Sequence, residues 1–277
     1  MKKTFLISGC ASGIGKHMAL ALARAPEQHN LMLIDLDGAA IERVVAEHGL
    51  AGVQRVMTRQ HDVRDAAGWE RVVAATVERF GVLDVMLNIA GYLKPGYIDA
   101  QSLDELDRHI DVNVKGVMYA TRVGAQQMKR QGRGHIVNVA SLAGIGHVPG
   151  LAAYCASKHA VRGFSLAVAH ELAPHGVAVS VVCPDAVETP MLELQVSYDE
   201  AAMTFGGGRG LSLEEVEHAM MKVLARRPLE VLLPVPGSGR AALSKLANAF
   251  PVLTKLGLRR TVALGRKAQV ARKAVTR

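Results

Sequence analysis

A tyrosine and a lysine four residues apart are the side chains of this sequence best suited to passing a proton. The apolar segment Ile136 to Ala140 predicts a buried strand that ends at Ser141, and the residues from Ala152 onward read as a helix. On that helix, Tyr154 and Lys158 share one face. A nearby ammonium favours the phenolate, so we expect the pKa of Tyr154 to fall from about 10 towards working pH, as a general acid or base requires. Ser141 could donate a hydrogen bond to the same oxygen.

Such a pair is also common on helices without a catalytic role, and a glycine-rich turn near the N-terminus is the observation that favours chemistry. Lys3 to Ser8 predicts a buried strand, and Met18 to Ala25 has the periodicity of a helix. Between them lies Gly9-Cys10-Ala11-Ser12-Gly13-Ile14-Gly15. Glycines there let the main chain approach a pyrophosphate, which the free N–H groups of the helix N-terminus can bind. The spacing differs from the common dinucleotide fingerprint, so the turn alone is weak evidence.

An acidic residue follows the second predicted strand. Asn30 to Ile34 reads as that strand, and it ends in Asp35-Leu36-Asp37. A carboxylate at this place accepts hydrogen bonds from a ribose 2′-OH and would repel a 2′-phosphate. The glycine turn contains no Lys or Arg. We therefore expect NAD in preference to NADP; the alternative is a solvated aspartate without a ligand.

Strands and helices alternate through residue 183 with short connections. This order predicts an α/β fold: a doubly wound parallel sheet of the Rossmann type, with helices on both faces in three layers and a basic helical C-terminal extension. Ligands of such sheets bind beyond the carboxyl ends of the strands. The residues expected at those ends would form one site: Gly9, Asp35, Asp62 with Val63, Asn88 followed by Ala90 and Gly91, Ser141 and Pro184.

Two long segments carry further expectations. A single helix is predicted from Ser102 to Gln131, with a capping box at its start and the polar Asn113 in its interior. Pro184 to Leu211 reads as a long loop with one short helix near Met191 to Gln195. Because Gly206 to Gly208 would make this loop flexible, it could act as a lid.

Composition narrows the class of protein. With 277 residues, 49% of them hydrophobic, the chain is long enough for one large globular domain, and no apolar run reaches the roughly 18 residues of a membrane span. Three separate cysteines form neither a disulfide framework nor a metal-binding pair, and no signal peptide is evident. We expect a reducing, cytoplasmic setting and no metal.

The excess positive charge lies in the C-terminal tail. We divide the chain into a domain of residues 1–239, which includes a substrate loop at 185–212, and a tail of residues 240–277. The tail contains ten Lys or Arg and no Asp or Glu, whereas the first 239 residues contain 23 basic and 25 acidic side chains. Several apolar residues of the tail are spaced to lie on one face of a helix, although Pro251 should break that helix. These residues are Leu243, Leu246, Phe250 and Leu253.

Two interpretations of the tail stay open. In the first, short helices pack over the substrate cleft and the last 15 or so residues are disordered in solvent. In the second, the tail lies peripherally on an anionic membrane. Nucleic acid is not an expected partner, because the tail has a single aromatic residue, Phe250, and so lacks a stacking platform.

Together these motifs resemble the short-chain dehydrogenases/reductases over roughly Lys3 to Leu233. The matching positions are Gly9, Gly13, Gly15, Asp62, Asn88-Ile89-Ala90-Gly91, Asn113, Ser141, Tyr154 and Lys158. The resemblance implies that Tyr154 passes the proton and that Ser141 steadies the substrate oxygen. It implies that Lys158 holds the nicotinamide ribose and lowers the tyrosine pKa, while Asn113 fixes a water that connects the lysine to solvent. The remaining residues counted as cofactor-binding are Ser12, Ile14, Leu36 and Val63, and Val187 and Thr189 near the carboxamide.

Three positions depart from the family pattern. Ser8 replaces a threonine before the first glycine and keeps the hydroxyl. Ile89 replaces a second asparagine. Asp185 replaces the glycine after Pro184, which would place a carboxylate beside the substrate entrance.

The family resemblance implies an oxidoreductase that moves a hydride between NAD and a secondary alcohol or ketone. Apolar pocket candidates favour a hydrophobic substrate, such as a steroid, retinoid or acyl-chain alcohol; they are Leu93, Ile145, Val148, Leu151, Met191 and Leu192. The helices 102–131 and 152–173 resemble those that the family uses to form homodimers and homotetramers. The main alternative is a catalytically idle dinucleotide-binding partner or sensor.

Overall fold

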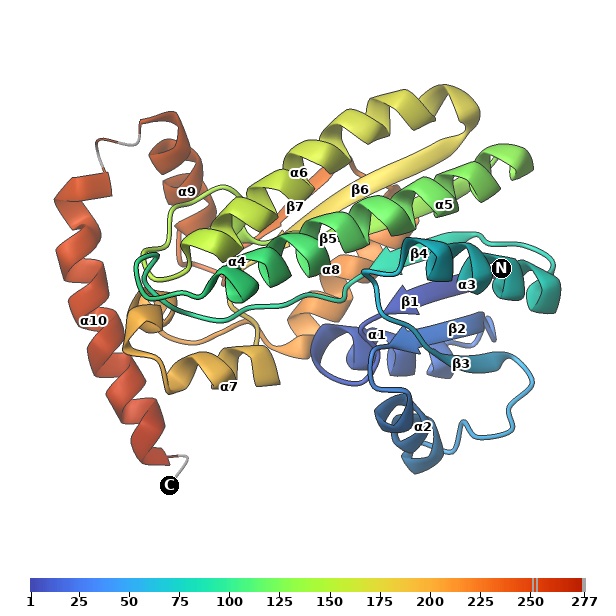
Figure 1. The fold of residues 1–277 in the computed structure, drawn as a ribbon, viewed down its shortest axis with the longest axis horizontal. Coiled ribbons are helices and arrows are strands. Elements are labelled where there is room, and N and C mark those ends of the chain that lie inside the picture. Colours follow the sequence, from blue (N-terminus) through green and yellow to red (C-terminus); the bar gives the residue numbers. More distant parts are fainter. Residues whose placement is uncertain (251, 253, 276–277) are drawn as a thin grey trace.

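A seven-stranded parallel sheet forms the centre of the computed structural model, which describes residues 1–250, 252 and 254–275 (Figure 1). The strands are β1 (Thr4–Ser8), β2 (Asn30–Asp35), β3 (Val56–Gln60), β4 (Val85–Asn88), β5 (Gly134–Val139), β6 (Val177–Pro184) and β7 (Glu230–Leu233). Their order is β3-β2-β1-β4-β5-β6-β7, and each neighbouring pair is parallel. The chain thus winds outward in both directions from β1 and β4, which confirms the predicted fold class.

Helices cover both faces of the sheet and complete the three layers (Figure 1). One face is covered by α1 (Gly13–Arg24), α2 (Gly38–Glu47) and α8 (Leu213–Arg226), and the other by α3 (Ala66–Phe80), α5 (Gly116–Gln131) and α6 (Ala152–Leu172). β1 shows why: Phe5 and Ile7 pack on the α1 side, whereas Leu6 packs with Trp69 of α3. A strand buried on both faces carries consecutive apolar side chains, as Phe5, Leu6 and Ile7 do.

The predicted helix 102–131 contains a π-helical turn. α4 (Leu103–Ile110) begins with the expected capping box of Ser102 and Glu105. A π-helical turn, Asp111–Lys115, then joins it to α5, and Asn113 lies in this turn. π turns insert one extra residue and often occur at functional sites. The chain is thus helical from Leu103 to Gln131 as predicted, but its hydrogen-bond pattern changes at the position of its most unusual residue.

The segment expected to be a flexible loop is largely helical. α7 (Pro190–Val196) is followed by the 3₁₀ helix η4 (Asp199–Gly207), and both precede α8. Gly206 is a packing position, because a Cβ atom there would lie 2.9 Å from the main-chain oxygen of Thr261. Glycine at 206 therefore permits close contact with the tail, a role that its sequence context did not reveal.

The tail forms two helices, α9 (Arg240–Ala249) and α10 (Thr254–Val275) (Figure 1). The predicted break at Pro251, like Leu253, lies outside the described residues. α10 docks on η4 so closely that a Cβ atom on Gly265 would lie 1.8 Å from the oxygen of Ala202. Helices that pack over the substrate segment are therefore confirmed, although α10, with 22 residues, is not short, and disorder of the last residues is wrong as far as Val275. Within the described ranges, no helix combines the length and the apolar character needed to cross a bilayer.

Candidate active site

One large cavity, of about 740 Å³, runs along the carboxyl ends of the strands. It extends from the end of β2 past the glycine turn to α6, α7 and the tail helices. Almost all of the predicted site residues line it: Gly9, Ser12, Gly13, Ile14, Gly15, Asp35, Leu36, Asp62, Val63, Ala90, Gly91, Ser141, Tyr154, Lys158, Val187 and Thr189. Asn88 and Asn113 do not line the cavity and lie behind its wall.

The glycine turn is shaped for close approach of a ligand to the main chain. Gly9 has a φ of +79°, and a Cβ atom there would lie 2.9 Å from the main chain of Ala90. A Cβ atom on Gly15 would lie 2.0 Å from the oxygen of Gly9. The side chain of Ser12, at the start of α1, makes no capping hydrogen bond, which leaves N–H groups of the first helical turn facing the cavity. This cradle fits a pyrophosphate.

Asp35 links the end of β2 to the glycine turn. One carboxylate oxygen accepts a hydrogen bond from the Ala11 N–H at 2.9 Å, and the other accepts one from the Asp37 N–H at 3.2 Å. The carboxylate is thus held at the rim of the cavity. Asp37 caps α2 through the Ala40 N–H, so the two neighbouring aspartates have separate roles.

Asp62 has a partner that the sequence analysis missed. Arg64 lines the same part of the cavity, and its guanidinium holds the Asp62 carboxylate at 3.0 Å from Nε and 2.6 Å from Nη2. These hydrogen bonds lower the pKa of Asp62. A basic residue two positions after an acidic strand end was the available signal.

Two of the positions that depart from the family pattern, Ser8 and Ile89, lie side by side at the ends of β1 and β4. The Ser8 hydroxyl accepts hydrogen bonds from the N–H groups of Ile89 and Ala90, at 3.1 and 3.2 Å, and so joins β1 to the segment after β4. Ile89 lines the cavity. Asn88 points away from it and donates to Asn138 at 2.8 Å, so any contribution of its side chain to a cofactor site is indirect.

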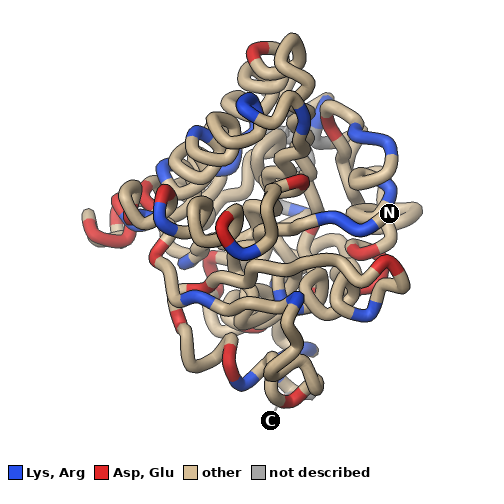
Figure 2. The backbone as a smooth tube through the Cα atoms, turned by 90° about the vertical axis from the view of Figure 1, so that its right-hand side faces the viewer, with Lys and Arg blue, Asp and Glu red and all other residues tan. Residues whose placement is uncertain are grey.

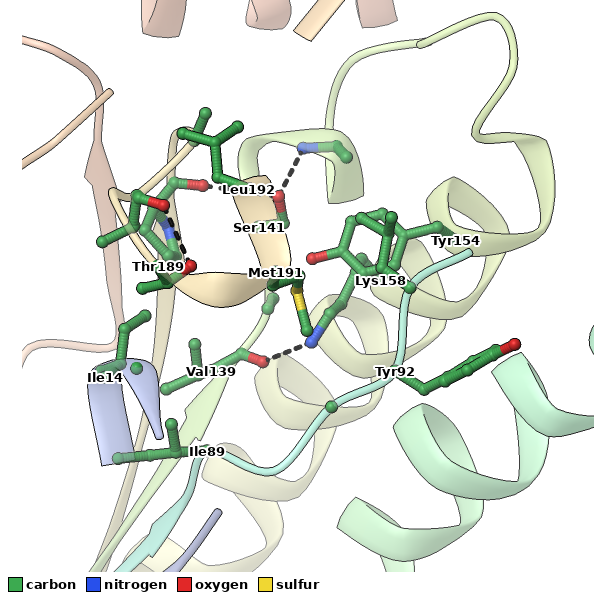
Figure 3. A pocket seen from close by; sticks show the side chains of 18 of the residues that line it. Ile14, Ile89, Tyr92, Val139, Ser141, Tyr154, Lys158, Thr189, Met191 and Leu192 are labelled. Carbon is green, nitrogen blue, oxygen red and sulfur yellow. Dashed lines mark hydrogen bonds between the residues drawn. The ribbon is translucent and has the colours of Figure 1, made fainter. Parts of the chain in front are cut away.

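Tyr154, Ser141 and Lys158 meet on one wall of the cavity (Figure 3). α6 carries the tyrosine and the lysine, and Ser141 follows the end of β5. The Ser141 hydroxyl lies beside the Tyr154 phenol and donates to the main-chain oxygen of Pro184 at 3.4 Å, and the Tyr154 ring centroid lies 5.6 Å from the Lys158 Nζ. Nζ donates to the main-chain oxygen of Val139 at 3.0 Å. The face shared by Tyr154 and Lys158, predicted from their spacing, is confirmed.

The electrostatics of this pair differ from the expectation. Burial raises the pKa of Tyr154 above its ordinary value, and the neighbouring Ser141 hydroxyl opposes that shift only in part. Burial also lowers the pKa of Lys158 to about 8. Because the ammonium is itself desolvated and bonded to Val139, it does not bring the phenol towards neutral pH in this state.

Asn113 supports the catalytic wall from behind. Its side chain donates to the Tyr92 oxygen at 2.8 Å and to the Ser157 hydroxyl at 2.9 Å, and it accepts from the Tyr92 N–H at 2.7 Å. Ser157 precedes Lys158 on α6, so Asn113 ties the π turn to the helix that carries the lysine. A water held by Asn113 stays a prediction.

The substrate end of the cavity is mostly apolar, and five of the six predicted residues line it. They are Leu93, Val148, Leu151, Met191 and Leu192. Ile145 was wrongly included, since it is buried in a cluster with Val117 and Val161. The missed lining residues come mainly from η4 and the tail: Met203, Thr204, Arg240, Leu243 and Thr261.

Asp185 is bound by the tail. Arg240 at the start of α9 donates to its carboxylate at 2.8 Å, and the Ala186 N–H donates to the same oxygen at 2.8 Å. Asp185 is almost fully buried. The expected free carboxylate beside the substrate entrance is therefore half of an ion pair that joins β6 to the tail.

α10 holds the substrate segment through buried polar contacts. The Gln269 side chain donates to the main-chain oxygens of Gln195 and Tyr198, at 3.0 and 2.7 Å. Arg272 forms ion pairs with Glu188 and Glu193. These contacts join residues more than 70 positions apart, and for that reason the sequence pattern did not predict them. Among the described residues, no group of His, Cys, Asp or Glu is arranged to hold a metal ion.

The comparisons with known proteins agree with this geometry. The family model for short chain dehydrogenase matches residues 3–199. The chain is 35% identical over 189 residues to 2,5-dichloro-2,5-cyclohexadiene-1,4-diol dehydrogenase LinX of Sphingobium indicum, covering 68% of this chain and 74% of that protein. It is 36% identical over 192 residues to 3-alpha-(or 20-beta)-hydroxysteroid dehydrogenase of Mycobacterium bovis, covering 69% and 71%.

A solved structure of similar fold contains a dinucleotide. It is a short chain dehydrogenase/reductase from Burkholderia phymatum in complex with NAD, with a TM-score of 0.80 and 27% identity over 91% of this chain and 95% of that one. The family match ends at residue 199, so α8 and the tail lie beyond it. This chain belongs to the short-chain dehydrogenase/reductase family of oxidoreductases.

Proposed function

We propose that the protein transfers a hydride between NAD and a hydrophobic secondary alcohol or ketone, with Tyr154 as the proton donor and acceptor. The observation that carries the proposal is the wall on which the Tyr154 phenol, the Ser141 hydroxyl and the Lys158 amine face one cavity with the glycine turn. When bound, the nicotinamide supplies or accepts the hydride. Tyr154 gives or takes the hydroxyl proton, and Ser141 holds the substrate oxygen.

The cofactor proposal rests on the fit of the cavity. The main-chain cradle from Gly9 to Gly15 would bind the pyrophosphate, and Asp35 would accept hydrogen bonds from the adenosine ribose. The described Lys and Arg residues of the lining already have partners: Arg64 pairs with Asp62, Arg240 pairs with Asp185, Arg108 lies over the Tyr92 ring, and Lys158 donates to the Val139 oxygen. No cation is therefore free to neutralise a 2′-phosphate beside Asp35 within this lining, which favours NAD. Lys158 would hold the nicotinamide ribose, and Val187 and Thr189 would lie near the carboxamide.

The substrate class follows from the apolar wall of Leu93, Leu151, Met191 and Leu192. Two relatives are named for a cyclohexadiene diol and for hydroxysteroids, which are compact, largely apolar alcohols. We also propose a cytoplasmic homodimer or homotetramer that pairs through α5 and α6. The three buried free cysteines are compatible with a reducing setting.

A cofactor-coupled screen tests this proposal. The protein is assayed with NAD and a panel of steroid, retinoid and acyl-chain alcohols, by absorbance of NADH. Tyr154→Phe should lower kcat about 1,000-fold while NADH binding, measured by calorimetry, is retained. Tyr97→Phe, which alters a half-exposed tyrosine away from the cavity lining, is the matched control. NADH binding without turnover across the panel would instead favour the idle dinucleotide-binding protein.

A further inference from the structure

The outward face of the tail is apolar and lacks a partner within the described structure. From Ala242 to Phe250, every described side chain of α9 and its end is exposed. The exposed fraction is 65% for Leu243, 49% for Leu246 and 58% for Phe250. On α10, Leu264 and Val270 are also exposed, at 50% and 66%. Large apolar side chains that are clustered and exposed mark an interaction site.

The cations of the tail divide into two sets. Arg240, Arg272 and Lys273 pair inward with carboxylates of the body. The second set is exposed, and the described structure places no carboxylate within ion-pair distance of it; its members are Lys245, Arg260, Arg266 and Lys267. The body is different, because Lys or Arg and Asp or Glu are interspersed over it (Figure 2). The outward face of the tail therefore combines apolar groups with unneutralised positive charge.

This face adjoins the mouth of the substrate cavity. Leu243 is exposed and also lines the cavity. Arg240 at the start of α9 and Thr261 on the inner side of α10 line the cavity too. A hydrophobic molecule that meets the outside of α9 thus has a short apolar route inward. α7, α9 and α10 gather at one end of the molecule (Figure 1), and Met191, Arg240 and Leu243 of these helices line the substrate end of the cavity there.

Charge and polarity together identify the partner. A nucleic acid would satisfy the cations but not the leucines, and Phe250 is the one aromatic residue of the tail. A second copy of this face would oppose like charges. An anionic bilayer satisfies both features, because apolar side chains enter the acyl boundary while cations meet the headgroups.

We propose that the outer face of α9 and α10 docks on an anionic lipid bilayer, and that an apolar alcohol passes from the lipid into the cavity beside Leu243. The second half of this statement rests on the proposed function, whereas docking does not.

Vesicle sedimentation tests docking without turnover. The full chain is mixed either with vesicles of phosphatidylcholine alone or with vesicles of phosphatidylcholine that contain about 30% phosphatidylglycerol. It should sediment with the anionic vesicles only and be released by high salt. Charge reversal at Arg260, Arg266 and Lys267 to Glu should weaken binding more than about tenfold, and Leu246→Ser with Phe250→Ser should weaken it at any salt concentration.

Matched controls separate the tail from the rest of the surface. Leu103→Ser with Ile98→Ser removes comparably exposed apolar side chains, and Lys222→Glu with Arg226→Glu reverses exposed charges on α8. These controls should sediment like the natural chain, and NADH binding by all variants verifies folding. The proposal is overturned if the protein does not bind anionic vesicles, or if the control variants lose vesicle binding to the same extent. It is overturned as well if the protein binds a DNA duplex as tightly as it binds vesicles and the double variant Leu246→Ser with Phe250→Ser leaves DNA binding unchanged. It is also overturned if the same face instead forms a dimer that these variants dissociate.

Discussion

The cofactor end and the substrate end of the cavity are built in different ways. At the cofactor end, the main chain itself forms the site, since Gly9, Gly15 and Ala90 approach within van der Waals distance at adjacent strand ends. At the substrate end, side chains of the tail hold α7 and η4 in place, as Gln269 and Arg272 do. The first construction depends on short sequence motifs, and the second depends on contacts between distant segments. The two ends should therefore fail separately when they are mutated.

The largest effect is expected at the cofactor end, from Gly15→Ala. The added methyl group would lie 2.0 Å from the Gly9 oxygen, so the turn must move and the pyrophosphate cradle with it. We expect NADH affinity to fall more than about 100-fold, measured by calorimetry. Gly163→Ala is the control, because nothing lies within 4 Å of the added group on α6. It should bind NADH normally and unfold at slightly higher urea concentration.

Gln269→Leu should weaken the docking of α10 at the substrate end and leave the cofactor end unchanged. This change removes the two hydrogen bonds that Gln269 donates to the main-chain oxygens of Gln195 and Tyr198, which should cost about 2 kcal/mol of docking free energy. Amide hydrogen exchange in η4 should accelerate about 30-fold, while the Kd for NADH stays unchanged. Lys267→Leu introduces the same side chain at an exposed position of α10 and should change neither quantity. Equal loss of NADH affinity in Gln269→Leu would show that the two ends are one cooperative unit.

The same contrast explains what the sequence could predict. The strand ends at Gly9, Asp35 and Ser141 were found because a doubly wound sheet places every strand end at one edge, and buried strands are recognisable as apolar runs. The π turn at Asn113 was missed because no local pattern distinguishes it from an α-helix. η4 was missed because Gly206 packs against Thr261 of α10, which follows more than 50 residues later. The pKa of Tyr154 was predicted to fall, whereas burial raises it. The prediction was wrong because the burial of the phenol is a property of the assembled cavity.

Cofactor preference sharpens the comparison within the cofactor end. Asp35→Asn keeps an oxygen that can accept the Ala11 N–H but removes the negative charge. We expect the ratio of NADPH to NADH affinity to rise about tenfold, since the repulsion of a 2′-phosphate is lost. Asp37→Asn alters the neighbouring carboxylate, which caps α2, and should leave the ratio unchanged. An unaltered ratio in Asp35→Asn would remove the structural reason for preferring NAD.

The smallest effect concerns Lys158, where the two ends meet. Its folded-state pKa of about 8 lies below its ordinary value of 10.5, because burial disfavours the ammonium. Between these values the unfolded chain binds more protons than the folded one, so this group makes the folded state more stable as the pH rises above 8. Relative to Lys158→Met, the free energy of unfolding without cofactor should rise by about 1 kcal/mol from pH 8 to pH 9 in urea titrations.

Comparison with the variant is essential, because burial also raises the pKa of Cys10 and Cys183, and these thiols oppose the trend above about pH 9 in both proteins. Lys222→Met, at an exposed site on α8, should show no such pH dependence. A flat difference between Lys158→Met and the natural chain would mean that the ammonium is compensated within the folded cavity. In that case the lysine could lower the pKa of Tyr154 even before the cofactor binds, as the sequence first led us to expect.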